Sequence, residues 1–425
     1  MAYREIKKAA RQVEQDQQQV EETVRSILEK VRQEGDGAIA YYEKKFDNFE
    51  PETFRVSEEE AVASKAKLPE HIVHEIHSSV ERALAFARIQ KESLVEFEKE
   101  LSPGQIVGQK LIPLESCGCY APGGRYPSIT SAILTIAPAK VAGVKRVIAC
   151  SPPGMKGEMD AGVLYAMHEL GVDEIYCFGG AQAIGAFTYG TETIRPVDFI
   201  VGPGNQYVNE AKRQAFGKVG IDLLAGPSEC LVIADESARA DYIAADLIAQ
   251  CEHDPNVRTG LVTTSESLAR KTMDEIERQL PERTTQEVAR SSWETYGVIA
   301  VVESLEEAAE YANEYAAEHV EIHTAEPRSL IPLLKNYGAL FLGENTAEVY
   351  SDKVACLNHP LPTGGSARFS GGLWVGQFLK VVTYQEMNQK ASERFARLTE
   401  ARCRYEGMDA HGYAAAIRLR NQKAS

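Results

Sequence analysis

The sequence has few cysteines, and their spacing is uninformative for disulfides or zinc ribbons. Eight cysteines in 425 residues are too few for a disulfide scaffold, and none has the C-x-x-C spacing of zinc-ribbon or thioredoxin-type sites. Cys117 and Cys119 form a C-x-C pair, and the other six are scattered. We therefore expect reduced and mostly buried thiols, as in cytoplasmic proteins.

Basic residues are also fewer than acidic residues. The 46 Lys and Arg residues stand against 62 Asp and Glu residues, which gives a formal net charge of −16. Because an acidic surface repels phosphate backbones, we expect no nucleic-acid partner. The net charge does not exclude an anionic small-molecule substrate, since a few local arginines can outweigh it.

Long apolar segments are missing as well. No stretch reaches about 18 uncharged apolar residues, so we expect no membrane span. The N-terminus, MAYREIKKAARQVEQDQQQ, lacks the apolar segment and the cleavage site of a secretory signal. The composition itself is ordinary, with 44% hydrophobic and 25% charged residues, which excludes disorder over most of the chain. The sequence thus predicts a globular, cytoplasmic protein.

An alternation of strand-like and helix-like segments predicts an α/β fold. β-Branched runs alternate with Ala-rich helical stretches from Ile106 onward, and again after residue 240. This alternation is typical of βαβ units and parallel sheets, and we expect two such units. The strands are predicted at 146–150, 174–178, 198–201, 231–234, 260–264, 297–302, 319–323 and 338–342.

The two ends of the chain differ from this pattern. Residues 4–34 predict one amphipathic helix, and residues 57–100 predict two helices with a break near Leu68-Pro69. The last segment, 376–425, is mostly helical in pattern and has little apolar content. A tail that cannot form its own core must pack on the body or on a partner chain.

Three glycine-rich loops are candidates for ligand binding. Residues 118–127 place two glycines after a proline and before Arg125, which suits a ligand loop with an anion-binding arginine or a simple turn with a surface arginine. Residues 179–185 and 201–205 each follow a predicted strand, where α/β proteins bind ligands and a helix N-terminus can accept a phosphate. None is G-x-G-x-x-G, so the glycines alone are weak evidence for NAD.

Two pairs of polar residues are candidates for chemistry. Gln250 and His253 share a helix face at i and i+3, and they form either a metal site or a helix end with a capping histidine. Glu318 and His319 lie at the junction between a predicted helix and a predicted strand. The pair is either a general acid–base pair or a surface histidine beside a helix-end glutamate.

Other histidines and acids are less informative when each is considered alone. They are Asp352, Asn358-His359 before the loop 362–365, and Glu406 with His411 in the tail. A further set, His71, His74 and His77, shares one face of a predicted helix. No acidic or cysteine partner has metal-ligand spacing there, so we interpret that face as solvated.

Taken together, these segments resemble the histidinol dehydrogenase family. The matching motifs are collinear and cover nearly the whole chain: YAPGG (120–124), GGAQAI (179–184), GPGN (202–205), AGPSE (225–229), AQCEHD (249–254), AEH (317–319), NHPLPT (358–363) and EGMDAH (406–411). The resemblance implies a zinc-dependent enzyme that uses NAD twice. It oxidises a primary alcohol to an aldehyde and then to a carboxylate, without releasing the aldehyde.

The resemblance also implies a role for individual residues. His319 would take the alcohol proton while hydride leaves to NAD, and Glu318 would then activate the water that attacks the aldehyde. The implied zinc ligands form an N/O set with room for substrate; they are Gln250, His253, Asp352 and His411. The implied NAD contacts are Tyr120, Gln182 and Asn205, and the implied substrate contacts are Ser228, His359 and Glu406.

The family's architecture implies a homodimer with shared active sites, in which His411 comes from the other subunit. It also implies two Rossmann-like parallel-sheet domains, one inserted in the other. The expected borders are an N-terminal helical arm at 1–20, a first α/β domain at 21–119 plus 229–372, a second at 120–228, and a swapped helical tail at 373–425.

The residues after Pro-Gly-Gly depart from the biosynthetic pattern, which has small or apolar residues there. The segments GCYAPGGRY (118–126) and ARFSGGLWVG (367–376) look more like the branch that includes sulfopropanediol 3-dehydrogenase. A guanidinium such as that of Arg125 suits a sulfonate, whereas it would repel cationic histidinol by roughly 1–4 kcal/mol within about 4 Å. We therefore favour dihydroxypropanesulfonate as the substrate.

Three alternatives remain. The substrate is histidinol or another small alcohol, or the protein is a non-catalytic homologue that binds NAD and zinc, or it is a purely structural α/β protein. The presence of every ligand-type residue argues against the non-catalytic homologue, since a degenerate copy should have lost some. Finding about one zinc per chain by elemental analysis would exclude a purely structural protein.

Overall fold

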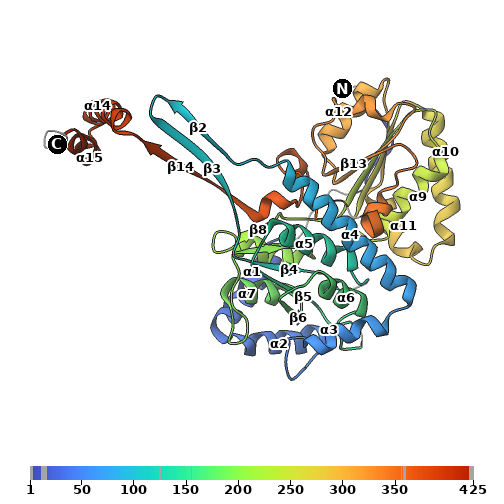
Figure 1. Cartoon of the computed structure of the whole chain (residues 1–425). Coiled ribbons are helices and arrows are strands. Elements are labelled where there is room, and N and C mark those ends of the chain that lie inside the picture. Colours follow the sequence, from blue (N-terminus) through green and yellow to red (C-terminus); the bar gives the residue numbers. More distant parts are fainter. Residues whose placement is uncertain are drawn as a thin grey trace. The chain divides into compact units, whose positions relative to one another are not determined.

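A computed structural model of the chain describes residues 3–10, 17–123, 126–154, 156–355, 357 and 360–420. The chain forms two compact units. One comprises Met1–Lys91 with Leu114–Phe378, and the other Glu92–Pro113 with Leu379–Ser425. The first unit contains two α/β sheets, and the second contains a small sheet and the last two helices (Figure 1).

A five-stranded parallel sheet in the first unit has the strand order β6-β5-β4-β7-β8. Because the chain winds outward from β4 first in one direction and then in the other, the ends of β4 and β7 form a topological switch point, where such sheets bind ligands. The strands are β4 (Ser116–Tyr120), β5 (Arg146–Ser151), β6 (Glu174–Cys177), β7 (Phe199–Val201) and β8 (Gly220–Ile221), and the helices are α5 (Ile129–Ala142), α6 (Ala161–Glu169), α7 (Gly180–Tyr189) and α8 (Gln206–Ala215).

The N-terminal helices pack on this sheet. Helices α1 (Gln17–Glu34) and α2 (Asp36–Asp47) share one apolar core with α7 and α8. The α1 residues in that core have the spacing predicted for an amphipathic helix; they are Val24, Ile27, Leu28 and Val31. Two more helices follow, α3 (Glu58–Ser64) and α4 (Glu70–Glu92).

A six-stranded sheet forms the other half of the first unit, in the order β1-β11-β10-β9-β12-β13. Only β1 runs antiparallel. The strands are β1 (Arg4–Lys7), β9 (Glu229–Ala234), β10 (Arg258–Thr263), β11 (Val298–Val301), β12 (His319–His323) and β13 (Ala339–Leu342), and the helices are α9 (Ala240–Cys251), α10 (Glu266–Gln279), α11 (Gln286–Tyr296) and α12 (Leu305–Tyr315).

The side chains of this sheet alternate between two cores, as strand geometry requires. Cys230 and Val232 pack against α9, α10 and α11, whereas Leu231 and Ile233 pack against α12. Figure 1 shows α12 on the opposite side of the sheet from those three helices. The predicted α/β fold with two parallel sheets is confirmed.

The second unit is an antiparallel sheet followed by a helical hairpin. Its strands, in the order β14-β3-β2, are β2 (Phe97–Ser102), β3 (Gln105–Pro113) and β14 (Leu379–Met387), and its helices are α14 (Gln389–Glu406) and α15 (Asp409–Arg420).

Three sequence predictions about the ends of the chain need correction. The helix expected over 4–34 is wrong at Arg4–Lys7, which pairs with β11, and residues 11–16 lie outside the described part. The helical pattern expected up to residue 100 ends at Glu92, and the tail contains the nine-residue strand β14. The partner strand is distant in the sequence for β1 and β14, whereas β2 forms a hairpin with the adjacent strand β3. In each case strand pairing overrides local helical propensity.

The predicted domain borders also shift. Strand β4 belongs to the five-stranded sheet, so the border at residue 119 would cut through a strand, and α1 and α2 pack with this sheet rather than with the six-stranded one. In the described part of the chain, no helix is both long and apolar enough to cross a membrane. Seven cysteines are buried and free, as expected, and Cys356 lies outside the described residues.

The face formed by His71, His74 and His77 on α4 is exposed, as predicted. His77 Nδ1 lies 3.0 Å from a carboxylate oxygen of Glu169.

Candidate functional site

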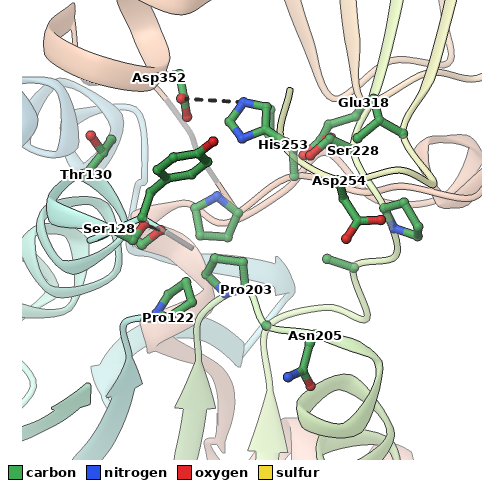
Figure 2. A pocket seen from close by; sticks show the side chains of 18 of the residues that line it. Pro122, Ser128, Thr130, Pro203, Asn205, Ser228, His253, Asp254, Glu318 and Asp352 are labelled. Carbon is green, nitrogen blue, oxygen red and sulfur yellow. Dashed lines mark hydrogen bonds and ion pairs between the residues drawn. The ribbon is translucent and has the colours of Figure 1, made fainter. Parts of the chain in front are cut away.

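A cavity of about 1100 Å³ lies between the two halves of the first unit. The five-stranded sheet contributes the loops after β4 and β7, which include Pro122, Gly123 and Asn205. The six-stranded half contributes the C-terminal end of α9, the start of β12 and the segment after β13. Residues from distant parts of the sequence therefore line one space (Figure 2).

Gln250 and His253 both line this cavity, together with Asp352. His253 Nε2 lies 4.0 Å from Asp352 Oδ2, and Figure 2 shows the two side chains facing each other. Gln250 is 1% exposed, and its Oε1 atom has no hydrogen-bond partner. An imidazole nitrogen, a carboxylate oxygen and an unsatisfied amide oxygen form a donor set that fits a divalent cation such as Zn²⁺. Gln250 and His253 do lie at the C-terminal end of α9, so the metal site remains a prediction that this donor set supports.

Glu348 is a buried residue of this site that sequence analysis missed. It begins the short helix α13 (Glu348–Tyr350), one turn before Asp352. Its Oε2 accepts a hydrogen bond from Gln250 Nε2, and its Oε1 lies 3.6 Å from His319 Nε2. Because Glu348 holds the nitrogen end of the amide, the oxygen of Gln250 is the atom left for a cation. Burial, with Asp352 and Glu321 nearby, raises the pKa of Glu348 to about 9.

Glu318 and His319 lie at the junction of α12 and β12. Ala316 has a φ of 53°, a left-handed conformation that ends α12 and turns the chain into the strand. The two side chains are only 6% and 7% exposed, and His319 Nδ1 lies 3.8 Å from Glu318 Oε2. Both line the cavity, so the interpretation as a surface histidine is wrong.

The Glu318 carboxyl group sits in an apolar and acidic environment. Burial raises its pKa well above the usual range, and the neighbouring acids Glu229, Glu348 and Asp352 add to the effect. Its Oε2 also accepts a hydrogen bond from the Glu229 N–H, at 3.1 Å, which opposes the shift. A carboxylate held in such a place is a stronger base than one in water.

A second polar cluster lies on the face of α9 that carries Gln250 and on the face of β12 that carries His319. Donor atoms of Asp246, Glu321 and His323 all lie within 4.8 Å of one another, a spacing that could also hold a metal ion. His323 Nε2 is 3.1 Å from Glu321 Oε2, and Glu321 Oε1 accepts a hydrogen bond from the Glu348 N–H. This network, which sequence analysis did not single out, anchors the start of the segment that carries Asp352.

Of the predicted cofactor residues, Asn205 lines the cavity, whereas Tyr120 and Gln182 are buried, at 4% and 1% exposed, and are not among its lining residues. Tyr120 ends β4, and its hydroxyl accepts a hydrogen bond from the Gly180 N–H at 3.2 Å. Gln182 in the first turn of α7 donates from Nε2 to Glu43, and its Oε1 has no hydrogen-bond partner. Asn205 caps α8 by accepting from the N–H groups of the second and third following residues. The unsatisfied Gln182 oxygen could accept a hydrogen bond from a donor group of a dinucleotide. No motif in the sequence pointed to Glu43.

The loop after β7 is held by a buried ion pair. Lys212 and Asp222 contact each other with fully buried side chains; Lys212 Nζ donates to the Gly202 carbonyl, and Asp222 accepts from the Gly202 N–H. Gly202 has a φ of 129°, and a Cβ there would lie 2.1 Å from the Tyr120 carbonyl oxygen. Only glycine therefore fits this close approach of two backbones.

Lys212→Met is expected to lower the free energy of unfolding by about 3–5 kcal/mol, because it leaves a buried carboxylate without its partner. Chemical denaturation would measure the change. The matched control Lys218→Met, on an exposed side chain in the turn after α8, should stay within about 0.5 kcal/mol of the wild type. A loss below 1 kcal/mol for Lys212→Met would show that the ion pair does not hold the loop.

The remaining predicted residues are placed as follows. Ser228 lines the cavity just before β9, and Figure 2 shows it near Glu318. Arg125 and His359 lie outside the described residues. Glu406 and His411 belong to the second unit, at the end of α14 and in α15, and both are exposed.

Comparison with known proteins agrees with this arrangement. Residues 10–419 match the sequence profile described as histidinol dehydrogenase. A "histidinol dehydrogenase homolog" of Shouchella clausii is 46% identical over 93% of both chains, and a "histidinol dehydrogenase" of Geobacillus kaustophilus is 44% identical over 93% of both chains.

A crystal structure of histidinol dehydrogenase from Elizabethkingia anophelis superposes with a TM-score of 0.92, at 33% identity, and covers 98% of this chain and 95% of that one. The profile match extends over nearly the full length and includes the five-stranded sheet, strands β9 to β13 and every segment that lines the cavity. The chain therefore belongs to the histidinol dehydrogenase family of NAD-dependent oxidoreductases.

Proposed function

We propose that the protein oxidises a small primary alcohol to the carboxylate by two successive hydride transfers to NAD, through an aldehyde that stays bound. The observation that carries this proposal is the convergence of Gln250, His253 and Asp352 on one cavity beside Glu318 and His319. Zn²⁺ bound by these three residues and by His411 of a second subunit would polarise and orient the substrate, and NAD would accept the hydrides.

The protein's own groups then have separate tasks. His319 accepts the hydroxyl proton during the first oxidation. Its buried imidazole lines the cavity, and an imidazole is the side chain most often used for such a proton transfer. Glu318 accepts a proton from the water that adds to the aldehyde carbon, since its carboxylate is a strengthened base. Tyr120, Gln182 and Asn205 hold the cofactor at the switch point, and Ser228, His359 and Glu406 contact the substrate.

The substrate we favour is 2,3-dihydroxypropane-1-sulfonate, which the reaction would convert to 3-sulfolactate. Gly123 and Tyr126, which lie close on either side of Arg125 in the sequence, both line the cavity. A guanidinium there would bind two sulfonate oxygens at once.

Histidinol, converted to histidine, is the second candidate. Two observations favour it: relatives at 41–44% identity are named histidinol dehydrogenases, and carboxylates outnumber basic side chains among the described residues that line the cavity. Bound Zn²⁺ would offset part of that negative charge.

A paired assay of NADH formation from the two substrates decides between them. We expect two NADH per dihydroxypropanesulfonate and little turnover of histidinol. Arg125→Ala should raise the KM for the sulfonate by about 10- to 100-fold, the worth of a charge-assisted hydrogen bond, while the exposed control Arg328→Ala should not.

Preferential turnover of histidinol, unaffected by Arg125→Ala, would contradict the sulfonate assignment. One NADH per substrate with free aldehyde accumulating would contradict the four-electron scheme for either substrate. Binding of zinc and NAD without turnover of either would favour a non-catalytic homologue.

A further inference from the structure

Glu43 is a buried carboxyl group for which the proposed reaction has no use. It lies on α2, which packs against α7 in the core of the five-stranded half, and it is completely buried. Its Oε1 accepts two hydrogen bonds, one from the Gly179 N–H at 3.0 Å and one from Gln182 Nε2 at 2.9 Å. A single oxygen therefore holds both the start of α7 and the side chain of the proposed NAD contact.

Two oxygen atoms of this pair lack hydrogen-bond partners. They are Glu43 Oε2 and Gln182 Oε1, and Gln182 is 1% exposed. While Glu43 is ionised, neither oxygen can donate, so Gln182 Oε1 stays available as an acceptor. When Glu43 is protonated, its O–H can donate to Gln182 Oε1 while the amide donates in return, because a carboxylic acid and a primary amide can pair through two hydrogen bonds.

The surroundings of Glu43 allow both protonation states. The titratable groups that its charge reaches are Asp47 on α2, Tyr120 at the end of β4, Cys150 in β5 and Cys177 in β6. All four are acids, so none supplies a compensating positive charge. Burial raises the pKa of Glu43 to about 7, and the two hydrogen bonds oppose this shift. The N-terminal end of α7 also favours the ionised form.

We propose that Glu43 is a positioning residue for the cofactor: its ionised form orients Gln182 and leaves the amide oxygen free to accept a hydrogen bond from a hydroxyl or N–H group of NAD, and its neutral form withdraws that oxygen. The inference rests on the proposed placement of NAD at Gln182. The carboxylate also occupies the start of α7, so the cofactor phosphates bind elsewhere than at this helix N-terminus.

The test is the dissociation constant of NAD for the zinc-loaded protein, measured by calorimetric titration between pH 6 and 8.5. In the wild type, protonation of Glu43 removes the acceptor, so the Kd should rise by about 3- to 10-fold as the pH falls through 7, the worth of one hydrogen bond. In Glu43→Gln the new amide can pair permanently with Gln182, so the Kd should stay near the acidic value at every pH.

Glu52→Gln, on an exposed side chain, is the matched control and should keep the wild-type profile. In kinetics, Glu43→Gln should act on the KM for NAD rather than on kcat, which separates positioning from general damage. The wild-type profile needs no variant, so the proposal stays testable even if Glu43→Gln fails to fold; a wild-type Kd that does not change with pH would overturn it.

Gln182→Leu distinguishes failure of the proposed NAD contact from failure of the proposed role of Glu43. An unchanged Kd in this variant would remove the proposed NAD contact and the inference with it. A raised Kd in Gln182→Leu, together with a wild-type profile in Glu43→Gln, would keep the contact and overturn only the role of Glu43.

Discussion

Glu318→Gln is expected to stop the reaction at the aldehyde and to lower the rate of the second oxidation by about 10²- to 10⁴-fold, the usual contribution of a general base. The variant keeps the shape of the side chain and the bond from the Glu229 N–H, but the amide cannot take a proton from water. Counting NADH per substrate in the presence of an aldehyde-trapping reagent would measure the effect, with one NADH expected in place of two.

His319→Asn is the companion variant and should slow the first oxidation instead, so that no aldehyde builds up. The two variants separate the roles of adjacent residues whose side chains lie 3.8 Å apart. If both kept wild-type rates for both steps, the assignment of the catalytic pair would be wrong.

The same carboxyl group gives the second oxidation a pH dependence. Burial raises the pKa of Glu318, and only the ionised form accepts a proton, so the rate of the second step should increase with pH and decrease as the carboxylate is protonated. Glu318→Gln should remove this dependence from its residual rate.

Asp352→Asn is expected to have the other large effect, on zinc binding. An amide is a poorer ligand than a carboxylate, and the loss should exceed the roughly 10- to 100-fold weakening typical when an outer hydrogen-bond partner of a ligand is changed. Glu348→Leu should weaken zinc binding by that smaller factor, because it removes the acceptor that orients the Gln250 amide. Zinc affinity, measured by competition with a chelator and by elemental analysis, should therefore fall more in Asp352→Asn than in Glu348→Leu.

Glu344→Gln, an exposed neighbour in the same segment, should retain about one zinc per chain. Retention of zinc by Asp352→Asn at wild-type affinity would exclude Asp352 from the metal site. Gln250 and His253 would then be the two remaining ligands from this subunit, which are too few to hold the ion without other residues.

The sequence predicted the two parallel sheets and most of their strands because each strand carries a local signal: a short β-branched run followed by glycine or a helical pattern. It failed at β2, where local composition favours helix or coil although the partner β3 is the next segment, and at β1 and β14, whose partner strands are far away in the sequence. Strand pairing of this kind depends on contacts that no window of neighbouring residues contains.

The sequence by itself determined the family and its candidate residues, since motifs such as AQCEHD and AEH keep their order along the chain. Only the tertiary structure decided which of them meet: it brought His253 within 4.0 Å of Asp352 and turned the free oxygen of Gln250 away from Glu348. It also revealed Glu43 and Glu348, isolated acids in ordinary helical segments. Their roles depend on burial and on the hydrogen bonds of a neighbouring amide, and both of these arise only when separate elements pack together.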